Sequence, residues 1–74
     1  MKASEAIRKI FEKSELKFSE LMDMLGVESN TLANRFKQDN LSVKKLDEMA
    51  RVMKYKIVLV PRDTRMKSDW YEVE

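Results

Sequence analysis

Small polar side chains between Ser29 and Asn34 offer the most specific chemistry in this sequence. Asparagine can form two hydrogen bonds with the N6 and N7 edge of adenine, serine can donate or accept at several bases, and alanine permits close approach to a thymine methyl group. At helical spacing one face would carry four such residues: Ser29, Asn30, Ala33 and Asn34. The segment therefore predicts hydrogen bonding to the edges of bases.

Other kinds of chemistry lack their usual residues. The chain has no cysteine and no histidine, so it offers no disulfide, no thiolate or imidazole metal ligand and no imidazole base. Catalysis would need carboxylate pairs, lysine or tyrosine in a pocket, and 74 residues leave little volume to enclose one. We therefore expect no enzymatic activity, no cofactor and no bound metal.

Apolar residues spaced three and four apart predict helices that would hold this segment in place. A first helix is expected at about 3 to 14, a second at about 18 to 25, a third at about 29 to 37 and a fourth from near Val43. Gly26, the only glycine, is placed to end the second helix in a left-handed conformation. Glu28 or Ser29 could cap the third helix and Ser42 the fourth, after a polar, turn-like stretch at 38 to 42.

The helical spacing also predicts which side chains face the core. These are Ala3, Ala6, Ile7, Ile10, Phe11, Leu16, Leu21, Met22, Met24, Leu25, Val27, Leu32, Phe36, Val43, Leu46, Met49, Ala50 and Met53. On this interpretation the methionines fill the core rather than form a partner-binding surface.

The pattern changes after the fourth helix. Tyr55 to Val60 is rich in β-branched residues and is closed by Pro61, which predicts a strand that is apolar on both faces and lies inside a sheet. Trp70 to Val73 could form a second short strand. Two copies of the chain could build a four-stranded sheet or pair their 55 to 60 strands across a two-fold axis. The expected dimerisation residues are Tyr55, Ile57, Val58, Leu59 and Val60.

About half of the chain, residues 17 to 53, resembles the Cro and phage lambda repressor type of helix-turn-helix, also called the xenobiotic-response-element family. The resemblance is carried by Leu25-Gly26-Val27, Thr31-Leu32, Asn34, Leu46 and Ala50. It implies a mainly α fold, with a four-helix repressor-like helix-turn-helix domain at 1 to 54. A C-terminal β-strand or β-hairpin region at 55 to 74, as in some antitoxin-type members, would belong to the same compact domain.

The resemblance also implies roles for individual residues. In that family the helix after the glycine turn enters the major groove and reads bases from its N-terminal part. Base contacts would then fall to Ser29, Asn30, Ala33 and Asn34, and phosphate contacts to Lys17, Lys37, Asn40 and Lys44.

The sequence departs from the family pattern at the second helix. The family commonly has a threonine or serine cap followed by a phosphate-binding glutamine, where this chain has Lys17 and Phe18. Ser19 would be the cap if the helix started later. Gln38 stands where a glycine often ends the recognition helix.

Charge is unevenly distributed although the net charge is only +2. Residues 1 to 26 and 46 to 74 are each balanced, so the excess lies in residues 27 to 45. There Arg35, Lys37, Lys44 and Lys45 face only Glu28 and Asp39. Such a surface would suit phosphate, although an imbalance of two charges is also what chance would produce.

We therefore expect a cytoplasmic, homodimeric repressor that binds double-stranded DNA at an inverted repeat, with recognition helices about 34 Å apart. The alternative is an antitoxin-like or regulatory module in which Arg62 to Glu74 captures a second protein. A generic helical bundle is the remaining possibility. No membrane association is expected, because no apolar run approaches the roughly 20 residues of a span and the first ten residues mix charges with apolar side chains.

Overall fold

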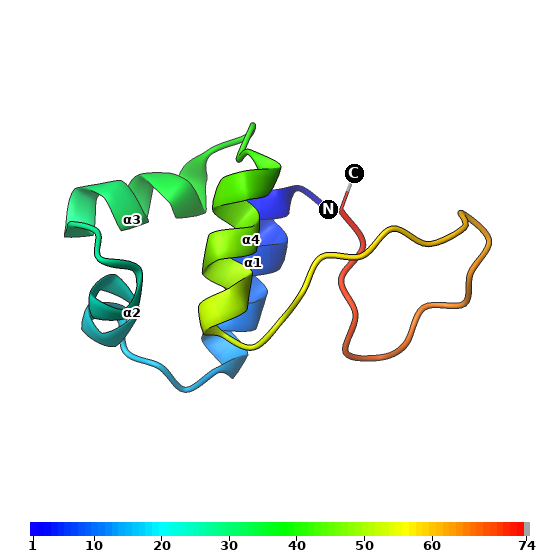
Figure 1. Ribbon diagram of the computed structural model, residues 1–74, viewed down its shortest axis with the longest axis horizontal. Coiled ribbons are helices and arrows are strands. Elements are labelled where there is room, and N and C mark those ends of the chain that lie inside the picture. The colour runs from blue at the N-terminus through cyan, green and yellow to red at the C-terminus, as the bar shows by residue number, and fades with distance from the viewer. Residues whose placement is uncertain (74) are drawn as a thin grey trace.

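A computed structural model describes residues 1–73 and contains four helices. They are α1 (Ala3–Lys13), α2 (Phe18–Leu25), α3 (Ser29–Lys37) and α4 (Val43–Val52). The four helices predicted from the apolar spacing are confirmed, and the first ends one residue earlier than expected. Helices α1 and α4 lie side by side, with α2 and α3 to one side and the C-terminal segment to the other (Figure 1). Glu74, the last residue of the expected C-terminal region, lies outside the described residues.

The core forms where the four helices meet. Each helix contributes one large side chain with no exposed surface: Ile7, Leu21, Leu32 and Met49. Around them lie further buried apolar residues, namely Ile10, Phe36, Leu41, Ala50 and Met53. Because α3 contributes two of these side chains, its orientation follows from the packing of the whole core.

Three side chains differ from the predicted core. Met24 and Val43 were expected inside but are 50% and 71% exposed, whereas Leu41 is only 8% exposed although its stretch was predicted to be polar and turn-like. Helical spacing gives the direction of an apolar face, but the neighbouring elements decide how much of that face they cover. Leu41 directly precedes the cap of α4, where an apolar side chain commonly packs back against the helix.

The structure shows which of the predicted capping residues form hydrogen bonds at the starts of the helices. The Ser42 Oγ accepts the Lys45 backbone N–H at 3.2 Å, which confirms the predicted cap of α4. Glu28 precedes α3 but its side chain makes no capping bond. Helix α2 starts at Phe18, so Ser19 is not its cap; instead the Lys17 backbone N–H donates to Glu20 Oε1 at 2.8 Å.

The predicted C-terminal strands are wrong for the single chain, since residues 1–73 contain no strand. From Tyr55 to Val60 the chain is irregular, Leu59 is fully exposed, and Ile57, Val58 and Val60 are 40% to 53% exposed. No backbone hydrogen bond connects residues 56–60 to another described segment. Trp70 to Val73 forms no ladder with them; the two segments meet through the rings of Tyr55 and Tyr71, 6.3 Å apart. A strand requires a paired backbone, and residues 1–73 supply none for this segment.

Candidate nucleic-acid interface

Gly26 sets the geometry between α2 and α3. Its backbone is left-handed, with φ 66° and ψ 36°, as the sequence predicted. The Gly26 N–H donates to the Asp23 carbonyl at 3.3 Å and the Val27 N–H to the Met22 carbonyl at 3.2 Å. This pair of bonds closes α2 and turns the chain sharply. Val27 then packs against the core, so that α3 begins two residues later in a defined direction.

We predict that Gly26→Ala lowers the free energy of unfolding by about 1 kcal/mol, because an L-residue is strained in the left-handed region. An added Cβ would meet no atom within 4 Å, so the cost is conformational rather than steric. Urea denaturation measures it. Gly26→Asn is the control and should cost less, since asparagine tolerates this conformation. Equal stability of Gly26→Ala and the wild type would contradict this account of the turn.

Helix α3 has a buried face and a polar face. Leu32 and Phe36 are buried, whereas Ser29, Asn30 and Asn34 are exposed, and Ala33 is half-buried. The side chains of the three exposed polar residues form no hydrogen bond within residues 1–73. The structure therefore brings the four predicted base-contact residues together on one helix, and three of them have side-chain donors and acceptors free for an outside partner.

The C-terminal end of α3 is held by contacts that the sequence analysis missed. The Arg8 guanidinium on α1 donates to the Phe36 carbonyl at 2.7 Å, placing a cation at the negative end of the α3 dipole. The Phe36 ring contacts the rings of Phe11 and Phe18, with centroids 5.4 and 6.5 Å away. Arg8 and Phe36 are 28 positions apart, and no local pattern pairs them.

Two charges counted in the predicted positive region are neutralised. Arg35 Nη1 lies 3.5 Å from Glu48 Oε1, and the Arg35 side chain is only 12% exposed, so Arg35 is not part of an open surface. Asp39 accepts a hydrogen bond from Lys2 Nζ at 2.9 Å. This hydrogen bond and the charge of Asp39 raise the pKa of Lys2 above its ordinary value. Both contacts link residues far apart in the sequence.

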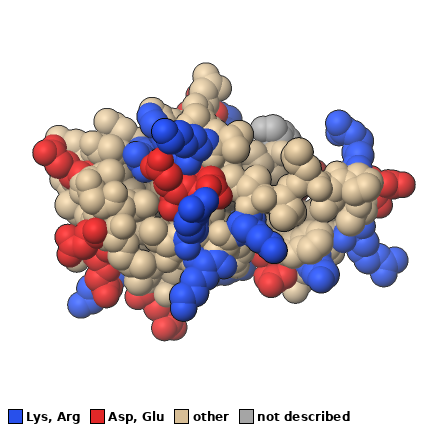
Figure 2. All heavy atoms as spheres, viewed as in Figure 1, with Lys and Arg blue, Asp and Glu red and all other residues tan. Residues whose placement is uncertain are grey.

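The remaining cations of residues 27–45 gather at one corner of the molecule. Lys37 is the last residue of α3, and Lys44 and Lys45 lie in the first turn of α4. All three are exposed, and no ion pair within the described part of the chain involves them. We call these three residues the α3–α4 basic corner, and Figure 2 shows lysine and arginine side chains gathered at the start of α4.

The predicted phosphate contacts fall into two places. Lys37, Asn40 and Lys44 are exposed and follow one another around the turn from α3 to α4. Lys17 lies apart from them, just before α2. Lys45, which the sequence analysis counted only as charge, belongs beside Lys44. Its position in the first turn after the Ser42 cap is the signal that could have identified it.

The other classes of site find little support in the geometry. Residues 1–73 contain no group of three or more acidic, histidine or cysteine side chains that could hold a metal ion. None of the described helices is long and apolar enough to cross a membrane. Comparison of the chain with family models, with curated proteins and with solved structures gives no match. Any function must therefore be argued from the arrangement of α2, α3 and the charges around them.

Proposed function

We propose that the protein binds duplex DNA in a sequence-specific manner, with α3 as the helix that enters the major groove, and that it acts as a transcription regulator of the repressor type. The observation that carries this proposal is the polar face of α3, where Ser29, Asn30 and Asn34 are exposed and unpaired. The Gly26 turn precedes this face, and burial of Leu32 and Phe36 turns it outward.

The roles follow from chemistry and position. Asn30 and Asn34 are one helical turn apart, so their amides can reach neighbouring base edges, where each good pair discriminates by about 1 to 3 kcal/mol. Half-buried Ala33 lies between them, and its small side chain leaves room for close approach to a thymine methyl group. The α3–α4 basic corner and Asn40 are suited to phosphate oxygens beside the groove, which fix register rather than sequence.

A homodimer explains the C-terminal segment. Tyr55, Ile57, Val58, Leu59 and Val60 form the proposed contact, and the last four are at least 40% exposed in the single chain. Antiparallel pairing of two such segments across a two-fold axis would give their backbones hydrogen-bond partners and cover apolar side chains. On this proposal the strand forms only on association, and two α3 helices face half-sites about 34 Å apart.

Selection of bound duplexes from a random DNA library tests the function. Enrichment of an inverted repeat is the expected result, because two identical α3 helices related by a two-fold axis read the same half-site twice. Failure to enrich any sequence, with the protein shown to be folded by circular dichroism, would contradict the proposal. It would favour the alternative function, a protein-interaction module, for which the exposed apolar side chains of Met66 and Val73 are the specific observation.

The dimer makes a separate prediction. Leu59→Asp should convert the protein to a monomer in equilibrium sedimentation at micromolar concentration, because it places a charge in the proposed contact. Leu59 is fully exposed in the single chain, so the substitution should leave the fold intact. Ser68→Asp adds the same charge at another exposed position and should leave the dimer unchanged. A monomeric wild type would refute the proposed contact.

A further inference from the structure

The densest positive charge of the protein lies outside the α3–α4 basic corner. Residues 54–67, which we call the C-terminal basic loop, contain five cations and one carboxylate. The cations are Lys54, Lys56, Arg62, Arg65 and Lys67, and the carboxylate is Asp63. Because the whole chain carries a net charge of only +2, the rest of the chain is net negative. Counting residues 46–74 as one block conceals this loop, since the acidic residues of α4 and of the chain end cancel it.

The loop has a defined shape although it contains no helix or strand. Its base is closed by the Tyr55 and Tyr71 rings, 6.3 Å apart. Two turns shape it, with the Thr64 N–H donating to the Pro61 carbonyl at 3.0 Å and the Trp70 N–H to the Lys67 carbonyl at 3.1 Å. Residues 55–71 therefore leave the helices and return to them as one excursion, which carries most of the C-terminal basic loop together with Asp69.

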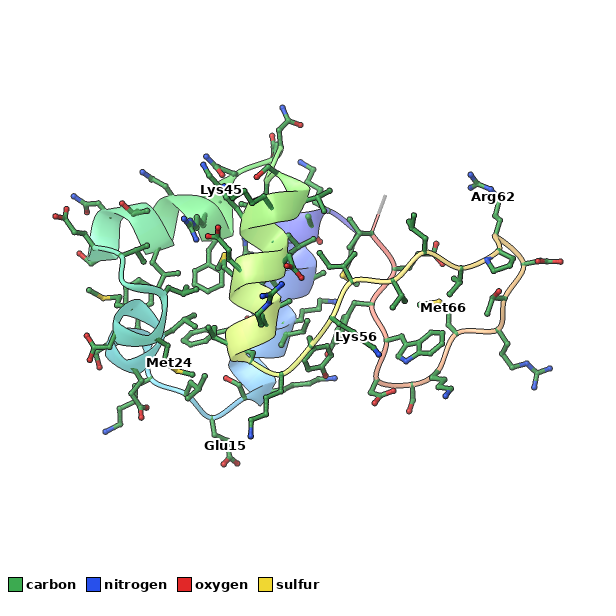
Figure 3. All side chains as sticks on the ribbon, in the orientation of Figure 1. Glu15, Met24, Lys45, Lys56, Arg62 and Met66 are labelled. Carbon is green, nitrogen blue, oxygen red and sulfur yellow. The ribbon has the colours of Figure 1, made fainter. Side chains whose placement is uncertain are left out.

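The loop projects from one end of the molecule, opposite α2 and α3 (Figure 1). Arg62 lies at its outer end and points away from the helices (Figure 3). All five cations are exposed. The longest dimension of the structure is 38 Å, so the loop forms a charged surface well separated from α3.

None of these cations forms an ion pair in the described part of the chain, a property that they share with the α3–α4 basic corner. Lys2, Arg35 and Arg51 each pair with a carboxylate, whereas no ion pair within residues 1–73 involves the loop. Lys67 Nζ lies 5.2 Å from the centre of the Trp70 ring, a contact that holds the side chain without neutralising it. Exposed cations of one sign without carboxylate partners create a local positive potential that attracts a polyanion.

We infer that the C-terminal basic loop is a second DNA-contacting surface, which binds the phosphate backbone outside the bases read by α3. This inference rests on the proposed function. Duplex DNA presents one negative charge per about 1.7 Å of helix axis, so a loop of this size meets several phosphates at once. If residues 55–60 pair across the two-fold axis, both loops lie next to that axis. The DNA phosphates that the two loops contact are then those between the two half-sites.

The salt dependence of binding tests the loop without knowledge of the operator. The probe is a mixed-sequence duplex of about 30 base pairs, titrated by fluorescence anisotropy at several salt concentrations. Each phosphate contact contributes about 0.9 to the slope of log K against log salt. Substituting Arg62→Gln, Arg65→Gln and Lys67→Gln together should therefore lower the slope by about 2.7 for each protomer bound, and shrink the loss of affinity between about 50 and 200 mM salt some 40-fold per protomer.

Matched single variants distinguish the effect of a cation's position on the salt dependence from the effect of the protein's net charge. Arg62→Gln and Lys9→Gln remove one exposed cation each, from the loop and from α1. Only Arg62→Gln should lower the slope. Asp63→Asn removes the one carboxylate of the loop and should tighten binding. Circular dichroism should show the same helix content for all variants, because the substituted side chains are exposed.

The outcomes distinguish this inference from the proposed function. If the wild type binds the duplex and the triple variant keeps the same slope, the loop inference is wrong while binding through α3 stands. Absence of duplex binding by the folded wild type at low salt would overturn both. If the triple variant instead loses binding to phosphatidylserine vesicles and keeps its DNA slope, the loop contacts anionic lipid and the inference is likewise wrong.

Discussion

Leu32→Ala should lower the free energy of unfolding by about 2 to 5 kcal/mol, because Leu32 is fully buried and its truncation leaves a cavity in the hydrophobic core. A domain of this size has a total stability of about 4 to 11 kcal/mol. The substitution therefore removes a large part of it and should lower the melting temperature by at least about 10 °C. Urea and thermal denaturation followed by circular dichroism measure both quantities.

The neighbouring position supplies the control for Leu32. Thr31 lies on the same turn of α3 but is exposed, and Thr31→Ala should change the free energy of unfolding by no more than about 0.5 kcal/mol. DNA binding by Leu32→Ala should fall in proportion to its unfolded fraction and return at low temperature. If the two variants unfold at the same urea concentration, Leu32 is not the residue that fixes α3 in the core.

The double variant Asn30→Ala with Asn34→Ala should lose most of the specific binding of the protein. Each amide contributes about 1 to 3 kcal/mol of base discrimination, so together they contribute about 2 to 6 kcal/mol. Each half-site of the selected inverted repeat should then be bound from about 30-fold to more than 10,000-fold more weakly. Binding to mixed-sequence duplex should stay nearly unchanged, because that binding depends on phosphate contacts.

Stability does not confound this second experiment. Both asparagines are exposed and their side chains make no hydrogen bond in the described part of the chain, so alanine should not destabilise the fold. Asn40→Ala is the matched amide control in the turn before α4 and should weaken specific and non-specific binding alike. If the double variant lost equal affinity for both kinds of DNA, the assignment of Asn30 and Asn34 as base-reading residues would be wrong.

The sequence by itself determined the four helices and their main caps. The three-and-four spacing of apolar residues is a local pattern, and so is a glycine after the last turn of a helix, which is why α2 ends at Gly26 in a left-handed conformation. Ser42 caps α4 by bonding a backbone group three residues away. The polar face of α3 followed in the same way, because Leu32 and Phe36 one turn apart define the buried side of a helix.

The tertiary structure alone decided which charges are free. Arg35 is removed from the predicted surface by Glu48, and Asp39 is neutralised by Lys2, which lies 37 positions before it in the sequence. Ion pairs form between side chains that packing brings together, and separation in the sequence does not predict that packing. The charge of the C-terminal basic loop can be counted from the sequence, but its position at the end of the molecule opposite α2 and α3 is visible only in the structure (Figure 1).

The C-terminal strand shows the same limit for the backbone. The β-branched composition of residues 55–60 predicted a strand, and that prediction is wrong for the single chain, because a preference for extended structure becomes a strand only when another backbone completes the ladder. Within residues 1–73 no segment pairs with it. A helix satisfies its hydrogen bonds within its own segment and can be predicted from it. A strand depends on a partner, and here only the tertiary structure revealed that residues 1–73 contain none.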